Sequence, residues 1–215
     1  MMGKKLAAAL VGTTAILVGV GMADIARRPV KPTETVVEVI DGDTFYIQNR
    51  QRVRLLGLDA PELEDCYGIE AKQALENIIL NKQVLLKEPR VDIYRRIIAL
   101  VYVDGKLINE YLVKNGFAYY RSAGTSELPS LKIANTYAQE NKLGIFGPNC
   151  FQQDPPDPKC PIKGNFDDNS DKKVYFLPSC SYYKPTVIMR FLGEQWFCSE
   201  AEAIKAGFEK SKYCK

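Results

Sequence analysis

Apolar and polar residues alternate over several short stretches in the first half of the chain, and turn residues separate those stretches. This period of two is typical of half-buried strands. It predicts three strands between residues 35 and 58, of which the second and third occupy residues 44–48 and 51–58. Two further strands are predicted at residues 83–88 and 96–103, so the pattern indicates five strands.

The hydrophobic period changes to that of a helix in three places. Residues 66–81 carry apolar side chains at helical spacing, namely Ala71, Ala74, Leu75, Ile78 and Ile79. A shorter helix is predicted at residues 107–115 and a third at 131–143, with Ser130 as its cap and Gly144 after its end. Five strands with helices in this order favour an α+β fold, mainly β, built on a five-stranded barrel of OB type.

Residues 1–27 precede this pattern and have the composition of a targeting segment. Two lysines come before an uncharged apolar run that ends at Asp24, and a pair of arginines follows. Such a segment is typical of a signal peptide. The run is also about as long as the roughly 20 residues that a membrane anchor needs. Both readings predict a protein that is secreted or anchored at the cell surface.

A change in composition divides the rest of the chain. The barrel pattern is expected within residues 28–150, and residues 151–162 are Pro-rich and polar, as is typical of a linker. Residues 163–215 then predict a small cysteine-containing domain with two or three strands and one helix at 199–206. Aromatic residues form its expected core, namely Tyr175, Phe176, Phe191, Trp196 and Phe197.

The six cysteines favour disulfides over metal binding. The sequence has no CxxC pair and no histidine to complete a zinc site, and an even number of cysteines suits an exported protein. Connectivity does not follow from sequence. We expect Cys66 to pair with Cys150 and Cys160 with Cys198, the latter stapling the small C-terminal domain.

Composition narrows the possible chemistry. The formal net charge of +3 over 215 residues is mildly basic, which by itself does not demonstrate nucleic-acid binding. The absence of histidine excludes histidine general bases, His-ligated zinc and Ser-His or Cys-His nucleophiles. Any hydrolysis must therefore depend on carboxylates, arginines and a metal.

Carboxylates cluster in sequence around one arginine, Arg54, which lies inside an apolar run. Antiparallel pairing of the second and third strands would bring Asp43, at the start of one, beside Asp59, at the end of the other. Such carboxylates raise one another's pKa unless a cation lies among them. A hard cation that prefers oxygen ligands, such as Ca²⁺, would remove this repulsion between the carboxylates. Glu62 follows in the next turn and is directed at the same place. The alternative is ordinary turn chemistry with solvated acids.

The chain resembles the staphylococcal nuclease family over about residues 36–148. The motifs that carry the resemblance are VIDGDTF, RLLGLDAPE, DIYRR, VDGKLINEYLVKNGFA and KLGIFG, in the family's order and at its spacing. The resemblance implies a five-stranded OB barrel with three helices, which agrees with the hydrophobic pattern. It also implies a Ca²⁺-dependent endonuclease that cleaves DNA and RNA and leaves 3′-phosphates. We expect the protein to be a monomer.

The resemblance also implies roles for single residues. The side chains of Asp43 and Asp59 and the main-chain carbonyl of Ala60 correspond to calcium ligands, with Asp41 in the outer sphere. Glu62 corresponds to the general base. The two arginines that stabilise the transition state correspond to Arg54 and Arg96, and Tyr94 corresponds to a substrate-binding tyrosine.

Four positions depart from the family pattern. Arg95 stands where a glycine is usual, and Ile93 stands where a basic residue is usual. Ser122 and Gly124 replace tyrosines that flank the nucleotide, although Tyr119 and its neighbour lie close. Base stacking on aromatic rings contributes about 1 to 3 kcal/mol per base, so affinity or base preference is expected to differ.

Two other classes of function are weighed against the enzyme. One is a catalytically idle OB-fold module that grips nucleic acid; its expected mark is the loss of a ligand or an arginine, and the catalytic set here is complete. The other is a structural protein that binds neither Ca²⁺ nor nucleic acid. The C-terminal segment resembles a cysteine-containing tail found behind some bacterial nuclease domains. In this chain we expect it either to stabilise the protein or to add a basic, aromatic face that binds nucleic acid.

Overall fold

The computed structural model describes residues 34–122, 124–167 and 172–214, with the side chain at position 167 excepted. These residues belong to one compact unit, Lys31–Lys215. The predicted signal peptide or anchor at residues 1–27 lies outside the described residues. Across the part of the chain that is described, no helix combines the length and apolar character needed to cross a membrane.

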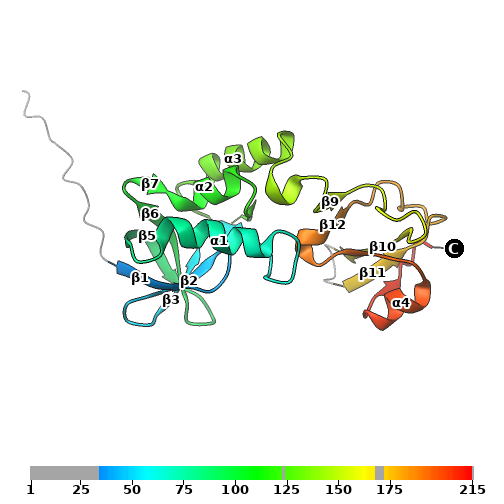
Figure 1. Cartoon of the computed structure of the whole chain (residues 1–215), viewed down its shortest axis with the longest axis horizontal. Coiled ribbons are helices and arrows are strands. Elements are labelled where there is room, and N and C mark those ends of the chain that lie inside the picture. The colour runs from blue at the N-terminus through cyan, green and yellow to red at the C-terminus, as the bar shows by residue number, and fades with distance from the viewer. Residues whose placement is uncertain (1–33, 123, 168–171, 215) are drawn as a thin grey trace, which may run out of the picture. The chain divides into compact units, whose positions relative to one another are not determined.

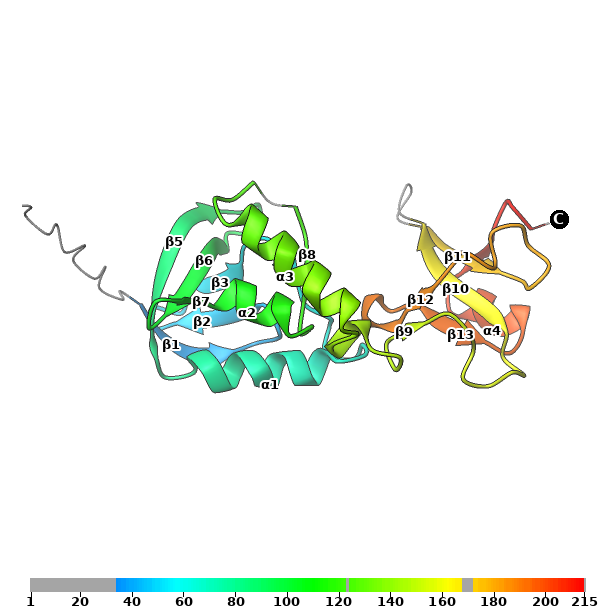
Figure 2. The ribbon, with the colours of Figure 1, turned by 90° about the horizontal axis from the view of Figure 1, so that it is seen from above.

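Five strands close into a barrel, which confirms the predicted OB-type fold (Figures 1 and 2). They are β1 (Glu34–Val39), β2 (Thr44–Ile47), β3 (Arg52–Leu55), β5 (Gln83–Val91) and β6 (Ile97–Val103). Their order is β3-β2-β1-β5-β6 with antiparallel neighbours, and a parallel pairing of β3 with β6 closes the ring. The short β7 (Lys106–Leu107) continues from β6. Closure brings the beginning of β6 beside β3.

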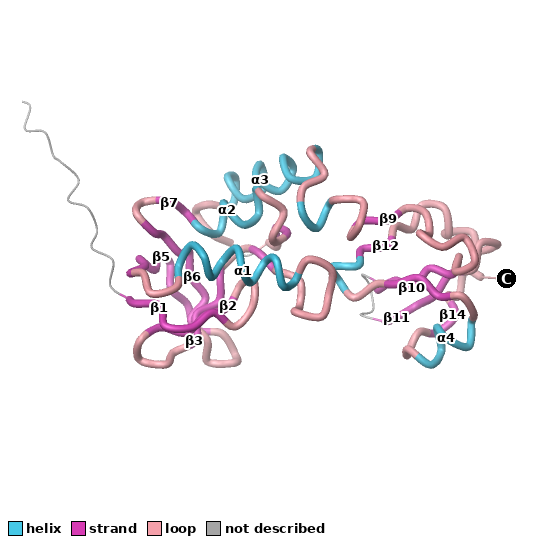
Figure 3. The backbone as a smooth tube through the Cα atoms, viewed as in Figure 1, coloured by secondary structure: helices cyan, strands magenta, loops and turns pink. Residues whose placement is uncertain are grey.

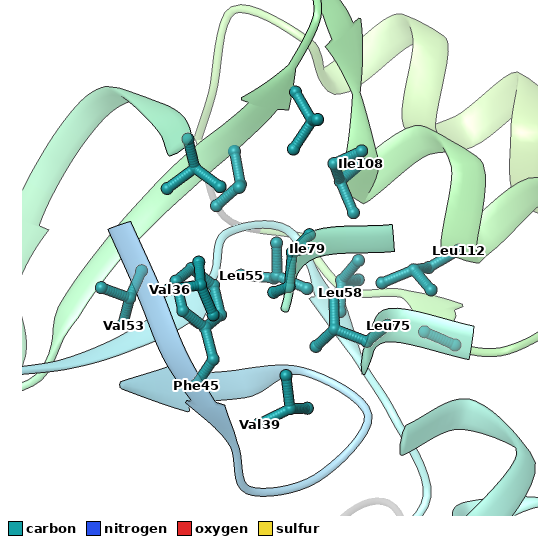
Figure 4. Packing of buried hydrophobic residues seen from close by; sticks show 14 of the residues in the cluster. Val36, Val39, Phe45, Val53, Leu55, Leu58, Leu75, Ile79, Ile108 and Leu112 are labelled. Carbon is teal, nitrogen blue, oxygen red and sulfur yellow. The ribbon is translucent and has the colours of Figure 1, made fainter. Parts of the chain in front are cut away.

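The barrel interior is filled by the inward-facing residues that the alternating pattern predicted (Figure 4). Val36, Phe45 and Val53 are fully buried there. Helix α1 (Gly68–Ile79) packs its apolar stripe into the barrel core, and α2 (Ile108–Lys114) contributes to the same core. Burying such side chains stabilises the fold by about 1.5 to 3 kcal/mol each.

The third helix, α3 (Leu128–Glu140), begins three residues earlier than predicted. Ser130 therefore does not cap it; the Ser130 hydroxyl lies inside the first turn and donates to the carbonyl of Glu127 at 3.1 Å. Pro129 explains the error, because proline is tolerated in the first turn of a helix, where its missing N–H has no helical partner. Gly144 begins a short 3₁₀ helix, η1 (Gly144–Phe146).

The strand predicted at residues 51–58 is two strands with different partners. It breaks at Gly57, which adopts φ +82°, a left-handed conformation that favours glycine. The first part, β3, stays in the barrel, whereas β4 (Leu58–Asp59) pairs with β8 (Tyr119–Tyr120). The register places Asp59 opposite Tyr119.

The C-terminal part has more strands than the two or three predicted (Figure 3). A sheet in the order β13-β10-β11-β14 contains β13 (Gln195–Phe197), β10 (Ile162–Asp167), β11 (Lys172–Phe176) and β14 (Glu209–Lys210). Two further strands, β9 (Phe151–Gln152) and β12 (Ile188–Met189), pair with each other and form a separate small sheet. β9 lies inside the predicted linker. Helix α4 (Glu200–Lys205) lies where a helix was predicted, with Ser199 as its cap. The 3₁₀ helix η2 (Arg190–Leu192) follows β12.

The expected aromatic core of this part is correct only in some members. Tyr175 and Phe197 are buried together with Phe208, which was not predicted. Trp196 is half-buried, and its indole N–H donates to the side chain of Gln152 at 2.9 Å. Phe191 belongs to a different cluster, where its ring packs against those of Phe146 and Tyr119.

Three disulfides use all six cysteines. The bonds Cys66–Cys150 and Cys160–Cys198 confirm the two expected pairs. The remaining bond, Cys180–Cys214, ties the chain's C-terminal end to the loop that follows β11.

Candidate active site

The carboxylate of Asp43 lies at the centre of a group of polar contacts just before β2. It is 2% exposed. Its Oδ1 accepts from the hydroxyl of Thr44 at 2.8 Å, and its Oδ2 accepts from the N–H of Ala60 at 3.0 Å. The N–H of Asp43 donates to Asp41 at 2.9 Å, so the turn brings both acids to the same end of the strand.

Arg54 joins the two carboxylates that the sequence pattern predicted to meet. On β3 it lies opposite Thr44 in the strand register, and so beside Asp43. Its Nη1 donates to Asp43 Oδ1 at 2.8 Å, and its Nη2 donates to Asp59 Oδ1. The two terminal nitrogens of one planar guanidinium thus bind two separate carboxylates. Asp43 and Asp59 meet through the arginine and the Gly57 turn, not by direct pairing of strand ends.

The charge of this cluster is incompletely balanced. Burial raises the pKa of Asp43 to about 7; Arg54 opposes this shift, and Asp41 adds to it. The pKa of Arg54 is raised, because the attraction of Asp43 and Asp59 outweighs its burial. A buried carboxylate in this state is stabilised by any further cation that reaches it.

Two residues that the sequence analysis did not assign to the site complete the surroundings of Asp59. The hydroxyl of Tyr119 donates to Asp59 Oδ2 at 3.3 Å, and Arg121 Nη1 donates to the same oxygen. Residues two apart on a strand face the same side, so the sequence Tyr-Tyr-Arg at positions 119–121 indicated that Tyr119 and Arg121 could act on one target. Its meaning depended on the pairing of β8 with β4, which sequence did not predict.

Glu62 lies on an exposed turn between β4 and α1. Burial of part of its side chain raises the pKa of Glu62, nearby Asp41 and Glu64 raise it further, and Arg54 lowers it. Those interactions place Glu62 within electrostatic reach of the cluster. Its carbonyl accepts from the N–H of Asp65 at 2.9 Å.

Arg96 contacts a carboxylate outside this cluster. At the beginning of β6, its Nε donates to Asp92 Oδ2 at 2.8 Å, and its guanidinium lies 5.2 Å from the centre of the Tyr94 ring. The parallel register sets Arg54 opposite Ile98, two residues beyond Arg96, so Arg96 lies just before the strand that pairs with β3. The structure thus brings together Asp41, Asp43, Arg54, Asp59 and Glu62, and places Arg96 and Tyr94 on the adjoining hairpin.

The departures from the family pattern lie on that exposed hairpin and on the surface near β8. Arg95 adopts φ +60°, a conformation that glycine takes without cost and that explains the usual glycine there. Ile93 is 89% exposed at the tip. Ser122 and Gly124 are exposed as well.

The donor set is suited to a hard cation. Carboxylates of Asp43 and Asp59 are oxygen donors of the kind that Ca²⁺ prefers, and the carbonyl of Ala60 adjoins them in the chain. Among the described residues, no group of three or more His, Cys, Asp and Glu side chains is arranged to hold a metal. The calcium ligands expected from the sequence, which are the side chains of Asp43 and Asp59 and the carbonyl of Ala60, therefore stay a prediction.

The structure combines a closed OB-type barrel with two carboxylates that one arginine joins, and groups of these kinds can bind cations and phosphate. Comparison with known proteins is more specific. The family model for the staphylococcal nuclease homologue matches residues 52–147. The chain belongs to the staphylococcal nuclease family.

Relatives from several bacteria support this assignment. An uncharacterized endonuclease of Escherichia coli is 32% identical over 116 residues, which cover 52% of this chain and 74% of the relative. A micrococcal nuclease of Shigella flexneri is 33% identical over 124 residues, with 52% and 71% covered. This sequence similarity to nucleases supports nuclease activity. The family match ends at residue 147, and residues 148–215 are called the C-terminal extension below.

Proposed function

We propose that this chain is a Ca²⁺-dependent endonuclease that hydrolyses phosphodiester bonds in DNA and RNA and acts as a monomer. The observation that carries the proposal is the bridge from Arg54 to Asp43 and Asp59, with Glu62 in electrostatic reach. We also propose that residues 1–27 export the protein or anchor it at the cell surface, because of their targeting composition.

The carboxylates of Asp43 and Asp59 and the carbonyl of Ala60 would hold the calcium ion. When bound, Ca²⁺ would neutralise charge on a phosphoryl oxygen and help to orient the substrate. The raised pKa of Asp43 supports this role, since a buried carboxylate with unbalanced charge favours a cation.

Glu62 would take the proton from the attacking water, and its exposure and its interactions with Asp41 and Arg54 support this role. Its exposed carboxylate can contact a water molecule, accept one proton at a carboxylate oxygen, and leave the water oxygen to form the new bond to phosphorus. The bond from phosphorus to the leaving oxygen breaks in the same displacement, and that oxygen keeps the electron pair and takes a proton from solvent.

The arginines would bind the charge that develops on the phosphoryl group. A guanidinium has five N–H donors, so Arg54 can hold both carboxylates and still donate to a phosphate oxygen. Arg96, just before β6, and Arg121, which is bonded to Asp59, would add positive charge for the bound nucleic acid. Tyr94, stacked near Arg96, offers a ring for a base.

Calcium dependence is tested by digestion of single-stranded DNA and of RNA with the full chain. We expect cleavage with Ca²⁺ and loss of cleavage when EGTA is added, with recovery when Ca²⁺ is restored. Cleavage that continues in EGTA would contradict the metal assignment. Retention of DNA on the protein without cleavage would instead show an idle binding module.

Gly68, the first residue of α1, tests whether the Glu62 turn must stay in place. A Cβ added at Gly68 would lie 1.9 Å from the carbonyl oxygen of Glu62, so Gly68→Ala must displace that turn. We expect a loss of about 1 to 3 kcal/mol of stability from overpacking. Because a misplacement of about 1 Å can cost 10²-fold in rate, cleavage should fall about 10- to 100-fold.

Gly105→Ala is the matched control for this change. It carries a positive φ of +78° but has open space where the Cβ would be placed. It should cost some stability through backbone strain and leave cleavage by the folded protein unchanged. Equal rates for the Gly68→Ala variant and the wild type would show that the turn is not rigidly required.

A further inference from the structure

A second apolar core, apart from the one inside the barrel, is shared between the C-terminal extension and the family-matched part of the chain. Its buried members are Ala138, Ile145, Phe146, Cys150 and Phe191. Partly buried residues packed against it are Cys66, Tyr67, Tyr119, Leu143, Met189 and Leu192. The extension enters this core through Cys150 and through residues 188–192, which comprise β12 and η2 and are called the 188–192 segment here.

Backbone hydrogen bonds hold the 188–192 segment in place. β12 pairs with β9, and the N–H of Arg190 donates to the carbonyl of Cys150 at 2.8 Å. The carbonyl of Arg190 accepts from the N–H of Cys66 at 3.4 Å. Arg190 therefore contacts both halves of the Cys66–Cys150 disulfide.

One chain of contacts runs from this segment to the carboxylate of Asp59. The ring of Phe191, which is 3% exposed, lies 5.7 Å from the ring of Tyr119, measured between centroids. Phe146 packs on the other side of Phe191 at 5.9 Å. The hydroxyl of Tyr119 donates to Asp59 Oδ2, so Phe191 packs directly behind a side chain that holds Asp59.

A second chain of contacts runs to Glu62. Cys66 lies four residues after Glu62, and the turn between them is closed by the bond from Asp65 N–H to the Glu62 carbonyl. The same short turn is fastened at its far end by the disulfide and by Arg190. A shift of the 188–192 segment would therefore be transmitted to the backbone of Glu62.

We propose that the C-terminal extension positions the active site: Phe191 orients Asp59 through Tyr119, and the attachment at Cys66 fixes the turn that carries Glu62. Phe191 is thus a positioning residue for the reaction. This inference rests on the proposed function, because that proposal gives Asp59 and Glu62 their chemical roles. It assigns to the extension a task that an independent stabilising domain would not have.

The test compares two phenylalanines of the extension in the full chain. Phe191→Ala removes the contact with Tyr119, whereas Phe208→Ala removes an equally buried ring whose aromatic contacts, Phe197 and Phe166, lie within the extension. We expect both variants to melt at a lower temperature. Phe191→Ala should also lower kcat on single-stranded DNA about 10- to 100-fold, with a smaller change in KM, as misplacement of reacting groups does.

A double-mutant cycle tests the route through Tyr119. It combines Tyr119→Phe, which removes the hydroxyl, with the milder Phe191→Leu, which keeps an apolar side chain in the second core. If Phe191 acts through that hydroxyl, the double variant should have the kcat of Tyr119→Phe alone. Additive losses, or a kcat for Phe191→Ala equal to that of Phe208→Ala, would overturn the inference.

Amide hydrogen exchange gives a readout that does not need activity. The N–H of Asp65 is bonded to Glu62, and the N–H of Arg121 to Gly57, so both report on the site's backbone. Phe191→Ala should accelerate their exchange and Phe208→Ala should not. Unchanged exchange in Phe191→Ala contradicts the positioning role. An inactive wild type with this accelerated exchange would contradict the proposed function alone.

Discussion

Glu62→Gln should lower kcat on single-stranded DNA by about 10²- to 10⁴-fold, the usual contribution of a general base. The amide has nearly the same size as the carboxylate but does not take up a proton at neutral pH. Because Glu62 lies on an exposed turn, the melting temperature should stay close to that of the wild type. The measurement is initial cleavage rate at saturating DNA, together with thermal unfolding followed by circular dichroism.

Glu64→Gln is the control for this variant. Glu64 is an exposed carboxylate two residues further along the same turn, and its removal deletes the same charge. Its kcat should stay near the wild-type value. If Glu62→Gln cleaved as fast as Glu64→Gln, the proton would have to be taken by another group and the assignment of Glu62 would be wrong.

Arg54→Lys should lower kcat/KM by about 10²- to 10³-fold, which is typical when a donor aimed at developing charge is lost. Lysine keeps the positive charge beside the buried Asp43, so the fold should survive better than with alanine. It lacks the fork that reaches both Asp43 and Asp59. Cleavage kinetics and the melting temperature separate the loss of geometry from a loss of folding.

Arg52→Lys provides the comparison on the same strand. Arg52 is exposed two residues before Arg54, so the substitution changes a guanidinium without altering the bridge between the carboxylates. Wild-type kinetics are expected for it. Near-normal cleavage by the Arg54→Lys variant would show that a point charge is enough at this position and that the forked geometry is dispensable.

Much of the fold could be predicted because its signals are local. Alternation and helical spacing located the barrel strands and α1, and the motif order identified the barrel type. Asp43 and Asp59 lie close in sequence, so their meeting was expected from a hairpin, although the structure brings them together through Arg54 and the turn at Gly57. Cys66 and Cys150 flank the barrel helices, and their pairing was also expected correctly.

The remainder depends on contacts between residues far apart in the chain. A break at Gly57 could not be distinguished from a continuous strand until β4 was seen to pair with β8, sixty residues away. The contact of Tyr119 with Asp59 follows from that pairing. Phe191 was assigned to the core of the C-terminal domain because it is an aromatic residue within that part of the sequence. Nothing local indicated that it packs with Phe146 in another cluster.

The Cys66–Cys150 bond also has a consequence for the denatured chain. It joins residues 84 apart and so encloses α1, β5, β6, α2 and α3 in one covalent loop. In the chain-entropy model such a loop disfavours the unfolded state by about 4 to 5 kcal/mol. In a chain unfolded by heat, this bond keeps the segment after Glu62 joined to residue 150. Such a chain searches fewer conformations on cooling, which favours recovery of activity after boiling over irreversible loss.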